Sequence, residues 1–167
     1  LVNNEWKPNE PLVLDTASRL YRNQSTTTNE HFVTAILQAL KKNTSVRIIV
    51  FQNTDFGLKA ALELEEVFAQ NDRLESVSLH NLLIDSRPAL VPSGVFKNKN
   101  LRELSIACCS LDATSCTAMV QKLHKSRRLR SLALEKVPMP VPRLISALQH
   151  KNASLSELCL KRMDLTE

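Results

Sequence analysis

Hydrophobic residues recur along this chain in a frame of five positions that returns every 26 to 28 residues. The clearest copy is the segment 101–111, which matches the pattern L-x-x-L-x-L-x-x-N/C-x-L with Cys109 at the N/C position. Within each copy, apolar and polar residues alternate as they do in a β-strand with one buried face. The pattern therefore predicts five strands, near residues 46–51, 74–79, 101–106, 129–134 and 155–160.

A second periodicity lies upstream of each predicted strand. Apolar residues such as Leu40, Ile36 and Val33 have the three- and four-residue spacing of one helix face. The pattern predicts a helix before each strand, and a short third helix because Pro88 and Pro92 suit only a helix entry. Three positions before each frame start stands an asparagine, or a serine in the fourth unit, and we expect the asparagines to end their helices in the left-handed conformation. These residues are Asn43, Asn71, Asn98, Ser126 and Asn152.

Each strand–turn–helix unit leaves an apolar face that only a neighbouring unit can cover. Stacked units predict an α/β solenoid, a segment of a right-handed α/β horseshoe with parallel strands on the concave face and helices on the convex face. The repeat resembles the leucine-rich repeat superfamily over about residues 30–167, and its unit length resembles the ribonuclease-inhibitor type. The asparagine that this family places at the strand exit is replaced here, which weakens the expectation of regular turns. The residues at that position are Thr54, Leu82, Cys109, Val137 and Met163.

The repeat frame divides the chain into two parts. Residues 1–28 fall outside the frame, and we expect an N-terminal cap or flanking segment there, with a degenerate extra repeat or an ordered linker as alternatives. Residues 29–167 form the predicted leucine-rich-repeat domain of about five units. The sequence stops just past the fifth predicted strand, so we expect further repeats in a longer protein or a partner that covers this end.

Composition argues against an enzyme. With two glycines, Gly57 and Gly94, the chain has no glycine-rich phosphate loop, dinucleotide-binding turn or nucleophile elbow. Its four cysteines lack zinc-ligand spacing, and we expect them to be reduced thiols in a cytosolic or nuclear protein. We therefore expect no catalytic residue, no cofactor, no metal and no transmembrane segment.

Two surfaces are candidates for binding a partner. Exposed strand positions should line the concave face with small side chains and a few charges, unless the small residues only relieve crowding between strands. They are Ser76, Ser78, His80, Glu103, Ser105, Ser131, Ala133, Glu135, Glu157 and Lys161. The segment 97–136 carries nine basic and three acidic residues, and its cations either form a basic edge or complement helix C-termini. The predicted basic edge consists of Lys97, Lys99, Arg102, Lys125, Arg127, Arg128 and Arg130.

These surfaces predict a non-enzymatic protein–protein interaction module, an intracellular scaffold or regulatory adaptor in the cytoplasm. The expected partner is another protein, with an acidic surface as the candidate for the basic edge. Nucleic acid is disfavoured because no aromatic residues interleave with the basic ones. Tropomodulin and CARMIL-type actin regulators carry similar repeats, which suggests a cytoskeletal role. The alternatives are the ligand-sensing repeats of an innate-immune receptor of the NOD-like type, or regulation of a small GTPase through Arg162.

Overall fold

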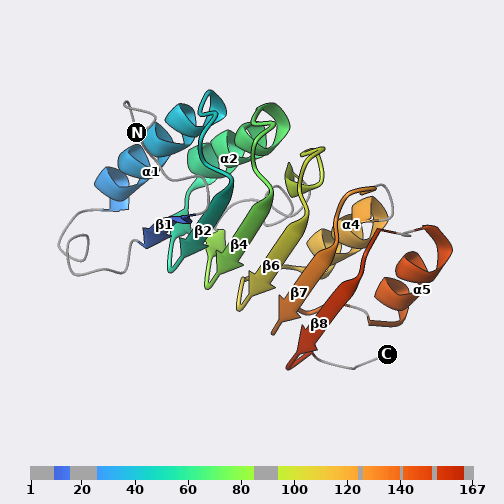
Figure 1. The fold of residues 1–167 in the computed structure, drawn as a ribbon. Coiled ribbons are helices and arrows are strands. Elements are labelled where there is room, and N and C mark those ends of the chain that lie inside the picture. The colour runs from blue at the N-terminus through green and yellow to red at the C-terminus, as the bar shows by residue number, and fades with distance from the viewer. Residues whose placement is uncertain are drawn as a thin grey trace.

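The computed structural model describes residues 10–15, 26–84, 94–123, 126–139, 141–151 and 154–163. They form a six-stranded, all-parallel sheet in which the strand order follows the chain order. The described helices lie on one face of this sheet (Figure 1), and the chain is therefore an α/β protein. The strands are β1 (Leu12–Asp15), β2 (Ile48–Gln52), β4 (Ser76–His80), β6 (Glu103–Ala107), β7 (Ser131–Glu135) and β8 (Glu157–Lys161).

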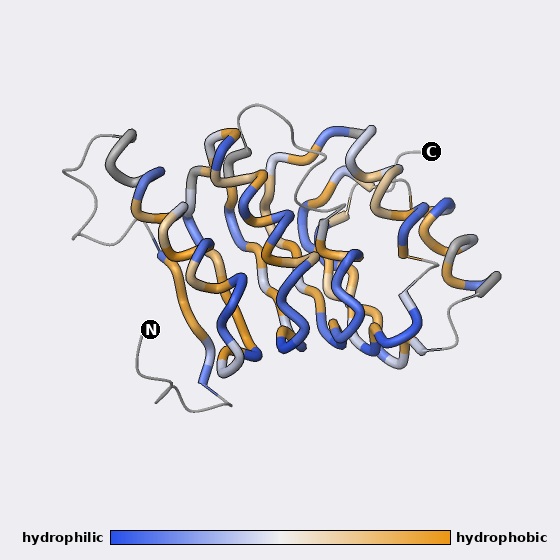
Figure 2. Tube along the Cα trace, turned by 90° about the horizontal axis from the view of Figure 1, so that it is seen from above, coloured by the Kyte–Doolittle hydropathy of each residue, from blue (hydrophilic) through white to orange (hydrophobic). Residues whose placement is uncertain are grey.

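Four helices are described: α1 (Thr26–Lys41), α2 (Leu58–Gln70), α4 (Ala113–Leu123) and α5 (Val141–Lys151). The apolar stripes predicted from spacing are the faces that these helices bury against the sheet, as at Ala61, Leu64 and Phe68 of α2. The predicted third helix falls largely on residues 85–93, which lie outside the described residues. Seen from above, hydrophobic and hydrophilic residues alternate along the chain, and hydrophilic ones predominate in a row of turns at one edge (Figure 2).

The strand register places equivalent positions of the sequence frame beside one another. Val77 pairs with Leu104, and Leu104 pairs in turn with Leu132. These side chains are buried in one continuous hydrophobic cluster that also contains the helix stripes. Alternate strand residues face away from the helices, so the period of two in the sequence separates the core from the exposed face of the sheet.

The turns after the strands are regular even though the asparagine expected at the strand exit is replaced. The first residue after each of the last five main-sheet strands has a positive φ close to 50°. Thr54 Oγ1 donates a hydrogen bond to the carbonyl of Gln52 at 2.9 Å, and Cys109 Sγ contacts the carbonyls of Ala107 and Leu79 at 3.4 Å. Two short strands, β3 (Asp55–Phe56) and β5 (Leu83–Ile84), pair just beyond these turns. The left-handed residues are Asn53, Asn81, Cys108, Lys136 and Arg162.

The predicted left-handed conformation of the helix-ending asparagines is wrong. Asn71 has φ −79° and ψ 108°, and neither Asn43 nor Asn98 has a positive φ. The Asn71 side chain instead donates to the carbonyls of Leu40 and Asn43 in the preceding unit, at 2.7 and 3.1 Å. Asn98 repeats this with the carbonyl of Asn71 at 2.7 Å. These asparagines therefore join consecutive units through their amides, whereas Asn152 lies outside the described residues.

The short apolar run near the N-terminus forms strand β1 at the edge of the main sheet. Leu12 pairs with Ile49 and Leu14 pairs with Phe51, in the same parallel register that joins the later strands. Leu14 is buried with the core, whereas Val13 is 48% exposed on the opposite face. Part of the segment 1–28 thus extends the sheet by one strand.

Candidate functional site

The exposed face of the parallel sheet carries three columns of residues that we call the sheet face. The middle column contains Ser78, Ser105 and Ala133, which pair in register and end at Cys159. The flanking columns run beside it, one at the start and one at the end of the strands. They hold Ser76, Glu103, Ser131 and Glu157 on one side, and His80, Ala107, Glu135 and Lys161 on the other.

The sheet face changes in character from one end of the sheet to the other. At the β1 and β2 end its middle column continues with Val13 and Val50, which are apolar. At the β8 end it carries Glu157 and Lys161 on the two flanking columns. All ten residues predicted for this face lie on strands β4 to β8, so the structure brings them together on one surface.

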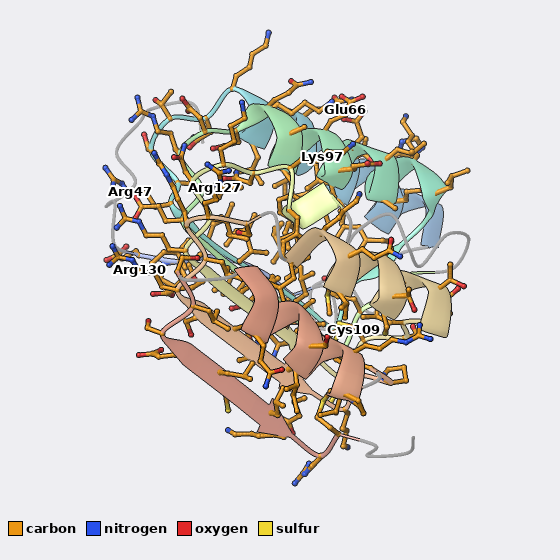
Figure 3. The ribbon with its side chains drawn as sticks, turned by 90° about the vertical axis from the view of Figure 1, so that its right-hand side faces the viewer. Arg47, Glu66, Lys97, Cys109, Arg127 and Arg130 are labelled. Atoms are coloured by element: carbon orange, nitrogen blue, oxygen red, sulfur yellow. The ribbon has the colours of Figure 1, made fainter. Side chains whose placement is uncertain are left out.

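A column that includes three arginines lies at the edge of the sheet where the strands begin. Arg47, Glu75, Arg102, Arg130 and Ser156 stand immediately before the five strands β2 to β8. From Glu75 on, the amide of each residue donates to the carbonyl of the one before it, over 2.7 to 2.8 Å. Figure 3 shows Arg47 and Arg130 at the same edge of the molecule, together with Arg127.

Three residues of this column, Arg47, Glu75 and Arg102, line a shallow hollow of about 160 Å³. Glu75 lies between two guanidinium groups, with its oxygens 2.8 Å from Arg47 Nη1 and 3.5 Å from Arg102 Nη1. Arg128 donates to the side-chain oxygen of Asn100 across one unit. The hollow is lined by Arg47, Asp72, Arg73, Glu75, Asn100, Arg102 and Arg128, four cations against two carboxylates.

The predicted basic edge is only partly assembled. Arg102, Arg127, Arg128 and Arg130 gather near the hollow, and Lys99 is exposed in the adjoining turn. Lys97 lies apart, over α2 (Figure 3), where its Nζ is 2.5 Å from Glu65 Oε1. Lys125 lies outside the described residues.

The helical face uses its charges to join neighbouring helices. Lys41 of α1 bonds both Glu63 and Glu66 of α2. The hydrogen bond from Lys41 lowers the pKa of Glu63, and its bonds to the two carboxylates raise the pKa of Lys41. Lys41, Glu63 and Glu66 therefore form a charge cluster between α1 and α2, on the helical side of the sheet.

Sequence reasoning did not place Arg73 and Asn100 in a candidate site. Each stands one position before a frame start, at Leu74 and Leu101, in a turn between helix and strand. The signal was available, because Arg128 occupies the same position of the next unit and lines the same hollow. A column-by-column reading of the turn residues, in addition to the strand residues, would have found them.

Three further findings concern metal-ligating groups, cysteines and membrane-spanning helices among the described residues. No group of three or more His, Cys, Asp and Glu side chains within them could hold a metal ion. All four cysteines are free, and burial raises the pKa of Cys116 to about 11. None of the described helices has the length and apolar character needed to cross a membrane.

Arg162, the residue suggested for regulation of a small GTPase, is close to one carboxylate, with its Nη1 3.5 Å from Glu135 Oε1.

Comparison with protein-family models and with curated proteins adds no relative to this picture. No model of a protein family matches the chain, and no curated protein matches it significantly.

Proposed function

We propose that the chain is a leucine-rich-repeat solenoid that acts as a protein-binding module, with the sheet face as its main contact surface. The observation that carries this proposal is the in-register stacking of five sequence units, whose outward positions form continuous columns on one face. The described helices cover one side of the parallel sheet, and the sheet face on the other side offers its columns of side chains to a partner.

The character of the sheet face supports a protein ligand. Its middle column of Ser78, Ser105 and Ala133 is flat enough to let a partner backbone approach, while Glu103 and Lys161 add charges for orientation. The backbone beneath is held by a continuous hydrogen-bonded ladder, so little ordering entropy opposes binding. The basic edge beside it favours a partner with acidic groups.

The proposed setting is intracellular, with the module serving as a scaffold or regulatory adaptor. Four free cysteines, two of them exposed, are compatible with a reducing compartment. A cytoskeletal partner is the version suggested by the repeat type. Cosedimentation of the folded protein with actin filaments or microtubules tests that version directly, and absence of the protein from both pellets contradicts it.

A matched pair of variants tests the role of the sheet face. Immobilised wild-type protein, Ser105→Arg and Gln70→Arg are each incubated with cell lysate, and retained proteins are identified by mass spectrometry. Ser105 lies in the centre of the sheet face, whereas Gln70 is exposed at the end of α2 on the helical side. We expect proteins that wild type and Gln70→Arg retain and Ser105→Arg loses. The same retained set for all three folded proteins would contradict the proposal.

A further inference from the structure

The column of residues that stand immediately before the main-sheet strands, here called the arginine column, contains one pair of neighbouring arginines with no acidic residue between them. Going from β2 to β7, the column reads Arg47, Glu75, Arg102 and Arg130. Arg47 and Glu75 form an opposite-charge pair, and so do Glu75 and Arg102. Arg102 and Arg130 are direct neighbours of like charge, joined by a backbone hydrogen bond of 2.7 Å. Like charges at adjacent strand positions repel, since neighbouring strands are only about 4.8 Å apart.

Of the four arginines around this place, Arg102 alone forms an ion pair within the part of the chain that the structure describes. Arg130, Arg127 and Arg128 take part in no ion pair there, and Arg128 bonds the neutral amide of Asn100 instead. Arg102 reaches Glu75 only at 3.5 Å, with its side chain 54% exposed. Positive charge therefore accumulates on the side of the hollow that faces β7.

Glu75 shows which group this edge accommodates. Its carboxylate lies between two guanidinium groups that come from the units on either side. Arg102 and Arg130, the next residues along the column, are instead direct neighbours, joined by one backbone hydrogen bond with no acidic residue between them. Guanidinium groups bind carboxylates through charge-assisted hydrogen bonds, which are stronger than neutral ones.

We propose that an acidic peptide segment of a partner binds at this edge and places one carboxylate between Arg102 and Arg130. This inference rests on the proposed function as a protein-binding module, and it specifies a second surface and the chemistry of what binds there. A neighbouring acidic side chain of the same segment contacts Arg128, whose guanidinium lines the hollow.

The mixed charges of the hollow favour a peptide over a uniformly anionic surface. Asp72 and Glu75 stand among the arginines, so a lipid headgroup layer or a nucleic acid backbone would meet two repelling carboxylates there. No aromatic residue lines the hollow to stack on a base. A peptide, by contrast, can place its carboxylates beside the arginines that lack an ion pair and keep them away from Asp72 and Glu75.

Fluorescence anisotropy with labelled hexaglutamate tests the proposal, and labelled hexaglutamine is the neutral control. We expect hexaglutamate to bind, and Arg102→Gln/Arg130→Gln to weaken its binding at least tenfold. The matched control is Lys42→Gln/Arg143→Gln, which also removes two positive charges, at exposed positions after α1 and in the first turn of α5. We expect this control to change affinity less than twofold. Equal weakening by both variants overturns the proposal, as does hexaglutamate binding no better than hexaglutamine.

Two further variants sharpen the test. Glu75→Gln removes the internal carboxylate that competes for Arg102, so we expect it to tighten hexaglutamate binding severalfold. Glu66→Gln makes the same charge change on the helical face beside Lys41, and we expect no tightening. Should the double variant lose its circular-dichroism spectrum, Arg130→Gln alone carries the test, because its side chain takes part in no ion pair among the described residues.

Other polyanions distinguish the source of the negative charge. The peptide assignment is overturned if phosphatidylserine vesicles or single-stranded oligonucleotides bind the wild-type protein more tightly than hexaglutamate does, and if Arg102→Gln/Arg130→Gln abolishes that binding. The outcome is separable from that for the sheet face. If Ser105→Arg still loses retained proteins while hexaglutamate does not bind, this inference fails and the proposed function stands.

Discussion

The buried asparagine at the end of α2 is a residue whose side chain is fully hydrogen-bonded. Its Nδ2 donates to two carbonyls of the preceding unit, and its Oδ1 accepts from the amides of Arg73 and Leu74, at 2.8 and 3.2 Å. Asn71 is 3% exposed, so water cannot replace these partners. The amide therefore satisfies backbone groups of two units at once and fixes their separation.

Asn71→Ala is expected to lower the free energy of unfolding by about 2–3 kcal/mol, since it leaves buried backbone groups without partners. Asn100→Ala is the control, because Asn100 makes its side-chain bonds in an exposed turn. We expect its cost to be about 1 kcal/mol or less. Urea unfolding followed by circular dichroism measures both, and equal losses would show that burying the interunit amide of Asn71 adds no stability.

The same residues show what a periodic sequence does and does not reveal. The chain carries two asparagine columns, one at Asn43, Asn71 and Asn98, and another at Asn53 and Asn81. The sequence interpretation assigned the left-handed conformation to the first column, and the structure has it in the second. Periodicity locates equivalent positions, but the choice between a backbone role and a side-chain role depends on which carbonyls lie within reach.

At the scale of the element, helix α4 begins at a side-chain cap that sequence reasoning did not identify. The Oδ1 of Asp112 accepts a hydrogen bond of 2.6 Å from the amide of Ser115, and the Ser115 hydroxyl donates to the same oxygen. These hydrogen bonds lower the pKa of Asp112. The carboxylate form is therefore the one that stabilises the start of the helix.

This cap predicts a contribution to the pH dependence of stability. Because the folded pKa of Asp112 is lower than the unfolded value of about 3.9, the stabilisation is present above that value and is lost as the pH falls below it. Asp112→Asn keeps a good capping residue without the titration. We expect its thermal midpoint to fall less than that of wild type between pH 6 and pH 3. A fall of the midpoint as large as that of wild type would contradict a contribution of this cap to the pH dependence.

The helices and strands could be predicted well from sequence, but the partners of the charged side chains around the sheet could not. Apolar spacing located the strands and the faces of α1, α2, α4 and α5, because each apolar face must be buried. Charged residues follow no such rule, since water accepts them almost anywhere. Lys97 and Arg102 were placed on one edge by their positions in the frame, yet Lys97 pairs with Glu65 over α2. Long charged side chains choose partners from neighbouring units that the sequence alone does not bring into view.

At the scale of the whole molecule, each unit is stabilised by the units beside it. The main sheet follows chain order from β1 to β8, so its main-chain contacts join consecutive strands. A strand in the middle of the order has two neighbours, whereas β8 at the edge has one. Residues at equivalent positions should therefore contribute different amounts to the free energy of unfolding, according to the place of their unit in the stack.

Leu132 and Leu158 allow this to be measured, because they pair in register at the same position of consecutive units. Leu132 is 1% exposed and Leu158 is 42% exposed. Leu132→Ala is expected to cost about 3 kcal/mol, as the substitution leaves a cavity in the core. Leu158→Ala removes a side chain that is already partly in water, and its expected cost is about 1 kcal/mol or less. Urea unfolding of the two variants under identical conditions gives the comparison, and equal costs would mean that a unit's stability does not depend on having a neighbour on both sides.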